Sequence, residues 1–373
     1  MKTTDFLQYF WQRVVSRIPL DSPDSLWLKP KPKKMNARKF SILVAVSFIV
    51  LISTERLHAQ KHADNDTSYY ETFWHHVTAR IYFAQKYTHF TMPSSASAND
   101  LQYVANPKLN LGIGVTWRNL SLNAFYGFAY LNNKDTVKGK TKGLDLQVHL
   151  FPRKWVIDLL VVMPKGFHLN PKGFASSDPN KYYYRPDVKE RVFGFAAYRL
   201  PNKKQFSYRA ALINNEWQKK SAGSPLYGLH AYYIIMESNT EDSLLVPKRV
   251  QSAFPKLAGI TESRFITIGP GIGYAYTLVI QKHLFIMGSA VLHADVNIMT
   301  EEHGETDWRK NTGIAAAIVY KAALGYNSSN WGFSASAAGN NFWAKGSSSQ
   351  KYNVMGGQLR FSLTKKIGPR KHA

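Results

Sequence analysis

The sequence contains no cysteine among its 373 residues. This absence excludes structural disulfides, thiol catalysis, zinc sites with cysteine ligands and lipid attachment at an N-terminal cysteine. Acidic residues are also scarce, with 24 Asp and Glu against 48 Lys and Arg, so the formal net charge is +24. Such an excess commonly indicates a nucleic acid or an anionic surface as partner. The positions of the charges along the chain decide whether such a partner is expected for this protein.

Long hydrophobic runs are missing as well, since the one extended apolar segment covers only residues 40–53. A helix that spans a bilayer needs about 20 apolar residues. Arg38 and Lys39 precede the run and Ala59 follows it, which is the layout of a secretory signal peptide. We therefore predict a signal peptide with cleavage after Ala59, rather than a short membrane anchor.

The predicted signal peptide divides the chain into an exported part and a part that is removed. Without residues 1–59, 38 basic and 20 acidic residues remain, so the net charge falls to +18. The basic residues are spread over loops, turns and the tail, so we expect contacts with lipid phosphates and no nucleic-acid partner. The predicted segments are an atypical or mis-assigned extension (1–34), the signal peptide from Met35 (35–59), a periplasmic segment (60–79), a barrel (80–365) and a basic C-terminal tail (366–373).

From about residue 80 onward, two kinds of side chain alternate along the chain. In residues 265–280 the even positions, such as Ile266 and Ile272, are mostly large and apolar, and the odd positions are mostly small. Side chains alternate across a strand, so this pattern predicts strands with two different faces. Segments of about ten such residues are typical of transmembrane β-strands. We therefore predict an all-β fold, an antiparallel up-and-down transmembrane β-barrel.

The number of strands follows from the alternation of short turns and long loops. An odd number would leave the two chain ends on opposite sides of the membrane. Omitting 206–213 gives 12 strands, which we favour, and adding a strand near 243–250 gives 14. The segments with the pattern are 80–91, 108–117, 120–131, 142–151, 155–164, 189–200, 206–213, 225–236, 264–280, 283–299, 310–326, 331–343 and 352–364.

Three tryptophans support the membrane interpretation. Trp117, Trp155 and Trp331 each lie next to a short turn, in the apolar phase of a predicted strand. Tryptophan is enriched where a membrane protein crosses from lipid to water. We predict that the three side chains form an aromatic girdle at one interface.

Two stretches carry a family resemblance, FSYRAALINNEWQKKSAGSPLYG (206–228) and YVANPKLNLGIGVTW (103–117). The chain resembles an uncharacterised family of Bacteroidetes proteins, domain of unknown function 4421, over most of 67–365. Its most specific part is QKKSAGS, from Gln218 to Ser224. The resemblance implies an outer-membrane β-barrel and no particular activity.

The same region holds a cluster of polar side chains. One interpretation is a lumenal site for a small polar, anionic or sugar ligand. The other is a hydrogen-bonded plug or turn that satisfies polar groups in the interior. The predicted lumen polar cluster consists of Tyr208, Arg209, Asn215, Glu216, Gln218, Lys219, Lys220 and Ser221.

Candidate catalytic and metal-binding groups are few. His149, His230, His293, Asp145 and Asp295 lie on polar strand phases, which lumen polarity alone explains. There is no G-x-S-x-G, H-E-x-x-H or complete phosphate-binding glycine motif, so we predict no catalytic residue, cofactor or metal. An acidic external loop is expected at Glu301, Glu302, His303, Glu305 and Asp307, solvated rather than calcium-binding.

These patterns predict location and fold better than activity. We expect an outer-membrane barrel with a polar lumen that acts as a structural, binding or narrow transport component. Its partners would be outer-membrane lipid, the barrel insertion machinery and a small polar or anionic ligand. The alternatives are an outer-membrane hydrolase of lipid or cell wall and a soluble periplasmic barrel that binds an apolar ligand.

Overall fold

The computed structural model covers the part of the chain in which the barrel is predicted. The chain divides into the units 1–62 and 63–373, and the described residues lie in the second unit. The predicted extension and signal peptide fall outside them. No helix among the described residues is long and apolar enough to cross a membrane. The described residues are 65–94, 99–106, 108–118, 120–128, 132, 135–238, 244–304, 307–346 and 351–368.

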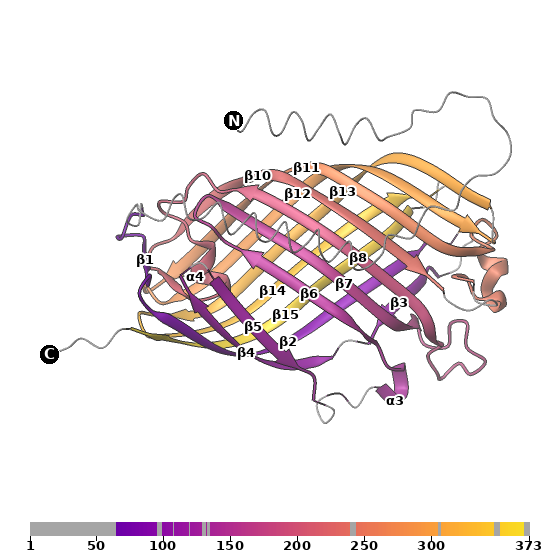
Figure 1. Cartoon of the computed structure of the whole chain (residues 1–373), viewed down its shortest axis with the longest axis horizontal. Coiled ribbons are helices and arrows are strands. Elements are labelled where there is room, and N and C mark those ends of the chain that lie inside the picture. The colour runs from indigo at the N-terminus through magenta and orange to yellow at the C-terminus, as the bar shows by residue number, and fades with distance from the viewer. Residues whose placement is uncertain are drawn as a thin grey trace, which may run out of the picture. The chain divides into compact units, whose positions relative to one another are not determined.

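The described chain consists mostly of long antiparallel strands (Figure 1). The long strands are β2 (Val77–Met92), β4 (Leu109–Trp117), β5 (Leu120–Tyr126), β6 (Lys142–Leu150), β7 (Trp155–Asn170), β8 (Tyr184–Arg199), β10 (Ala222–Glu237), β11 (Ile260–Ile280), β12 (Leu284–His303), β13 (Asp307–Asn327), β14 (Trp331–Lys345) and β15 (Lys351–Ile367). The short elements are β1 (Tyr70–Thr72), β3 (Leu101–Ala105), β9 (Glu216–Gln218), α3 (Asp135–Lys138), α4 (Tyr208–Leu212) and the 3-10 helix η2 (Lys248–Ala253).

Ten of these strands close into a hydrogen-bonded ring, in the order β15-β14-β13-β12-β11-β10-β8-β7-β3-β2. The ring closes where β15 pairs with β2. The hairpin β4–β5 extends from β2, and β6 extends from β7. In the described part of the chain, β5 and β6 do not pair with each other.

The predicted closed ring of 12 strands is therefore wrong, although each of the 12 favoured segments contains a strand. The reason is β3, which lies in a stretch expected to be loop. It pairs with β2 on one side and with β7 on the other, so it closes the ring without β4, β5 and β6. The alternative of 14 strands is also wrong, because the described residues 244–247 form no strand and the 3-10 helix η2 begins at Lys248.

The two faces of each strand differ as the alternation predicts. In β11, Ile272 is 72% exposed, whereas Thr267 and Ala275 on the opposite face are fully buried. Ile272 lies beside Leu292 of β12, which is also exposed. The outside of the wall is therefore apolar, which is the reverse of a soluble barrel.

The half of the lumen near the long loops is filled by apolar side chains. Residues 244–257, between β10 and β11, contribute Leu245, Val246, Phe254 and Leu257 to this cluster. The predicted polar lumen describes this half only in part, because the buried charged side chains of Arg185, Glu190 and Glu301 lie beside an apolar cluster on which the loop packs. The strands contribute buried residues that include Phe90, Tyr103, Phe167, Ile234, Phe265, Met299, Phe342 and Tyr352.

The opposite end is filled by the connection between β8 and β10, which we call the plug (residues 200–221). The segments 189–200 and 206–213, which carry the strand pattern, leave room for a short turn at 201–205, but β10 begins only at Ala222. The plug contains α4, which the hydroxyl of Ser207 caps by accepting a hydrogen bond from the amide of Ala210 at 3.1 Å. It also contains β9, which pairs with β1. Asn327 at the end of β13 donates from its amide to the carbonyls of Ala210 and Glu216, each at 2.8 Å.

Candidate functional site

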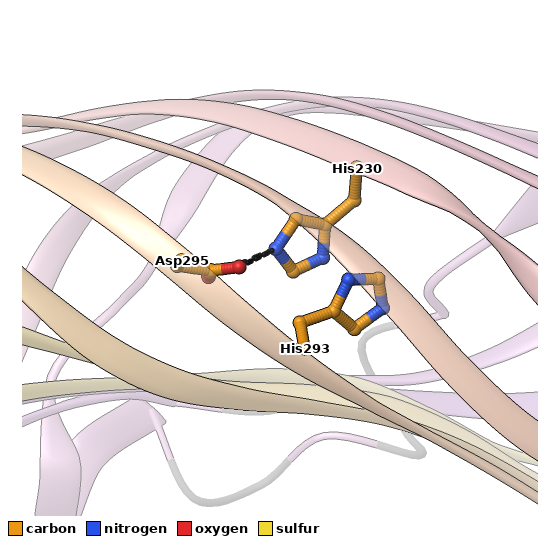
Figure 2. Close-up of side chains that lie close together, drawn as sticks. All are labelled: His230, His293 and Asp295. Atoms are coloured by element: carbon orange, nitrogen blue, oxygen red, sulfur yellow. Dashed lines mark hydrogen bonds and ion pairs between the residues drawn. The ribbon is translucent and has the colours of Figure 1, made fainter.

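Two histidines and an aspartate meet in the barrel interior (Figure 2). His230 comes from β10, and His293 and Asp295 come from β12. The strand between them, β11, carries Gly269 and Gly271 at this level. A Cβ atom on Gly269 would lie 2.3 Å from the Asp295 carboxylate, so glycine is required for the side chains to meet.

Hydrogen bonds account for most polar atoms of this group. The carboxylate of Asp295 accepts from Nε2 of His230 at 2.8 Å and from the hydroxyl of Thr267 at 2.8 Å. Nε2 of His293 lies 3.1 Å from the hydroxyl of Tyr198. His230, His293 and Asp295 are 0%, 3% and 1% exposed.

The geometry does not suit a metal ion. The two imidazole rings are stacked, with centroids 3.6 Å apart and planes inclined by 3°. Imidazole binds a metal through a lone pair in the plane of the ring, at about 2.0–2.1 Å for zinc. Two parallel planes at this separation cannot both contain one ion. The hydroxyl of Thr267 donates to Asp295 rather than to a histidine, so it is not an activated nucleophile either.

A cavity of about 260 Å³ lies in the lumen, and the histidine pair does not line it. Its volume is slightly below the usual range for ligand pockets, so it fits a small molecule. Apolar lining side chains include Leu160, Val162, Val192, Ile234, Val319 and Phe342. Charged lining side chains are Lys86, Lys108, Lys142, Asp145, Asp158 and Lys321, and His149 also lines the cavity.

Two ion pairs border the cavity. The ammonium of Lys86 lies 2.6 Å from the carboxylate of Asp145. The ammonium of Lys321 lies 2.6 Å from Asp158, whose other oxygen is 2.6 Å from Nδ1 of His149. The lining thus holds four lysines against two aspartates, and its electrostatics favour an anionic group.

Asp145 and His149 were candidates from the sequence, but their partners were not, namely Lys86, Asp158 and Lys321. A signal for two of them is present, because Asp158 and Lys321 interrupt the apolar runs VIDLLVV and IVYKAALG. Charges in otherwise apolar membrane strands usually have a function or a partner. Which residues pair could not be predicted, since the partners are far apart in the sequence.

The predicted lumen polar cluster lies in the plug, and its polar groups bond mainly to the plug itself. Glu216 accepts a hydrogen bond from Ser207 at 2.5 Å and pairs with Arg153 and Arg209 at 3.8 and 3.7 Å. Arg209 also donates to Asn215 at 3.2 Å. These contacts correspond to the plug interpretation of the cluster.

The remaining cluster residues bond either within the plug or to the strands and the N-terminal segment around it. The amide of Gln218 donates to the carbonyl of Gln205 at 2.6 Å, and its oxygen accepts from the Ser207 amide at 3.0 Å. The backbone amides of Lys219 and Lys220 donate to the Tyr69 carbonyl. The hydroxyl of Tyr208 shares a hydrogen bond with that of Ser289. Ser221 accepts from the amide of Val279 at 2.9 Å.

Tyr70 of β1 connects the N-terminal segment to the plug. Its hydroxyl donates to the carbonyl of Lys203 at 2.7 Å and accepts from Arg153 at 2.7 Å. Burial raises the pKa of Tyr70 to about 12, so the hydroxyl remains protonated and keeps donating. The turn end of the lumen is therefore closed by bonded groups.

The three predicted girdle tryptophans lie at the turn ends of their strands and are partly exposed. Trp117, Trp155 and Trp331 have exposures of 49%, 38% and 48%. A cation lies over each ring, at 4.5 Å for Arg118, 5.6 Å for Arg199 and 4.2 Å for Lys365. This arrangement is suited to an interface where lipid meets water.

The expected acidic external loop is wrong, because β12 extends to His303 and β13 begins at Asp307. Glu301 is 1% exposed and accepts a hydrogen bond from the hydroxyl of Tyr352 at 2.5 Å. The strands extend this far because their alternation continues through these polar residues.

A closed antiparallel ring with an apolar exterior defines an outer-membrane-type β-barrel. The chain belongs to the family described as domain of unknown function (DUF4421), whose model matches residues 64–363. This match confirms the resemblance found in the sequence. No curated protein matches the chain.

Solved structures of outer-membrane proteins are similar to the chain only at low levels. The outer membrane protease OmpT from Escherichia coli is 10% identical, with a TM-score of 0.38, over 79% of this chain and 98% of that chain. OprG from Pseudomonas aeruginosa is 12% identical, with a TM-score of 0.23, over 82% of this chain and 100% of that chain. These similarities are too distant to indicate an activity.

Proposed function

We propose that the protein resides in the outer membrane and binds a small anionic amphiphile inside its lumen, instead of conducting solutes across the membrane. The observation that carries the proposal is the position of the 260 Å³ cavity between the plug and the apolar cluster at the long loops. A pore would need a continuous aqueous path, and both ends are occupied by packed side chains. A binding protein needs only the cavity.

The chemistry of the cavity wall supports this class of ligand. One side is apolar, with Leu160, Val192 and Phe342, and suits a short hydrocarbon or aromatic body. Lys86 and Lys321 lie on the wall and suit a carboxylate or phosphate. Each lysine already has an aspartate partner, so a ligand anion would compete with that aspartate.

Residence in the outer membrane predicts a heat-modifiable protein in that membrane fraction. Barrels resist unfolding by detergent at room temperature, because all backbone groups of the wall pair within the protein. We expect boiling to change the electrophoretic mobility of the protein from fractionated native cells. Recovery in the soluble periplasmic fraction, without a change on boiling, would contradict the proposal.

Three probes of equal chain length test the ligand class, namely octanoate, octanol and octylamine, titrated into the barrel in nanodiscs of zwitterionic lipid. We expect octanoate to bind about tenfold more tightly than octanol, and octylamine not to bind, since the lysines attract only the anion. Asp145→Asn frees Lys86 from its partner and should tighten octanoate binding several-fold. Asp66→Asn, in the exposed N-terminal segment, is the matched control.

The opposite order of affinities would exclude this class of ligand. If octylamine binds as well as octanoate, the lysines do not select the ligand. If none of the three probes binds, the cavity is not a site for a small amphiphile.

A further inference from the structure

In the part of the chain that the structure describes, the barrel wall has one interruption, which we call the seam and define as the facing edges of β5 and β6. β5 pairs only with β4, and β6 pairs only with β7, within the described residues. On one side of the seam the wall continues from β5 through β4 to β2, and on the other side it continues from β6 to β7. Figure 1 shows β5 and β6 on the same side of the barrel.

Side-chain exposure at β5 agrees with an open edge. Asn123 and Phe125 belong to the phase that faces the lumen, because they pair with Gly114 and Gly112 of β4. Both are exposed, Phe125 at 45%. In the continuous part of the wall, the lumen-facing residue Ser334 is only 1% exposed.

Apolar side chains border the seam on its outer face. Leu122 and Tyr126 of β5 are 64% and 67% exposed, and Leu144 and Leu146 of β6 are 48% and 54% exposed. Outward positions of such a wall meet the acyl chains of the bilayer. The seam therefore faces lipid and not water.

On the side of the long loops, the seam ends where β3 closes the ring. There the amide of Asn106 donates to the hydroxyl of Thr141 at 2.8 Å, and the side chain of Asn106 donates to the carbonyl of Gly139 at 2.9 Å. Thr141 in turn donates to the carbonyl of Gly166 at 2.6 Å. These bonds join the residue after β3 to the residues before β6 and to β7, so the opening lies on the turn side of them.

The cavity lies directly behind the seam. Phe125 on one edge and Gly143, Asp145 and Gln147 on the other edge all line it. Lys86 connects the two edges, because its ammonium lies 4.8 Å from the centre of the Phe125 ring and 2.6 Å from Asp145. A molecule that passes between β5 and β6 would meet this ammonium first.

We propose that the seam is a lateral entrance, through which an anionic amphiphile dissolved in the membrane passes into the cavity. The inference rests on the proposed function and adds the origin of the ligand. The hydrocarbon part moves between the apolar edges, and the anionic group takes the place of Asp145 at Lys86. The same anion arriving from water would have to cross the plug or the apolar cluster instead.

The chain has no native cysteine, so a covalent bridge across the seam can be introduced cleanly. Ala124→Cys with Leu146→Cys places one thiol on the outer face of each edge, and a flexible bis-maleimide joins them. Leu122→Cys with Val148→Cys is a second pair, in case the first impairs folding. The matched control joins Ala197→Cys and Leu229→Cys, which are already paired neighbours on β8 and β10.

Exchange of ¹³C-labelled octanoate, measured by NMR in nanodiscs, reports entry and exit. We expect the bridge across the seam to slow both rates at least about tenfold, because gating motions of the wall are then blocked. The bridge between β8 and β10 should leave both rates unchanged. Unchanged rates in both seam variants would overturn the lateral entrance and show entry from an aqueous end. Failure of octanoate to bind the unbridged protein would overturn the proposed function itself.

Discussion

Replacing Ile272 with lysine is expected to lower the free energy of unfolding in a lipid bilayer by about 2–4 kcal/mol. The Ile272 side chain is 72% exposed in the middle of β11 and touches the acyl chains if the barrel spans a membrane. An ammonium at this depth loses its hydration. On a protein surrounded by water, an exposed substitution of this kind changes stability by no more than about 0.5 kcal/mol.

Urea titration of the barrel in lipid vesicles measures this difference. The matched control is Val137→Lys in α3, because Val137 is 61% exposed but lies outside the wall. We expect the control to change the free energy of unfolding by no more than about 0.5 kcal/mol. Equal effects of the two substitutions would mean that the outer face of β11 is not in contact with lipid.

Replacing Lys321 with methionine is expected to destabilise the barrel by about 3–5 kcal/mol. The side chains of Lys321 and Asp158 are 6% and 13% exposed, so the substitution leaves a carboxylate away from water without its cation. His149 remains as a hydrogen-bond partner at 2.6 Å but does not replace the missing ammonium. The free energy of unfolding in vesicles is again the measured quantity.

The control for this prediction removes both charges. In the double variant Lys321→Met with Asp158→Leu, no buried charge is left alone, so we expect most of the stability to return. A single and a double variant of equal stability would show that Asp158 does not depend on Lys321. The argument that the cavity wall holds fixed, paired charges would then fail.

The sequence predicted the strands well because the alternation is a local property. An apolar exterior on one side and a packed interior on the other impose the two-residue period on every strand, as Ile272 and Thr267 in β11 illustrate. The tryptophans at 117, 155 and 331 lie on the exposed phase of their strands. The period could not predict which strands close the ring, because pairing between distant segments leaves no local pattern.

Two of the missed elements, β3 and α4, are too short to show a period. β3 has five residues, and α4 has five residues within a segment that alternates by chance. An amphipathic helix shows its pattern only over several turns. The error in the strand count and the error in the short turn at 201–205 both follow from these two elements.

The candidate site was predictable only in part. The plug residues were found as a polar cluster, because they are contiguous in the sequence. The cavity was not found, since Lys86, Asp145, Asp158 and Lys321 come from β2, β6, β7 and β13. Their meeting depends on the closure of the ring and on the course of β4 and β5 away from β6.

The central claim is that the cavity in the lumen binds a small anionic amphiphile. A crystal structure of the barrel with 8-bromooctanoate tests it most directly, because anomalous scattering locates the bromine. We expect the bromine among Leu160, Val192 and Phe342, with the carboxylate at Lys86. Bromine found only on the outer surface of the wall, with the cavity unchanged, would contradict the claim.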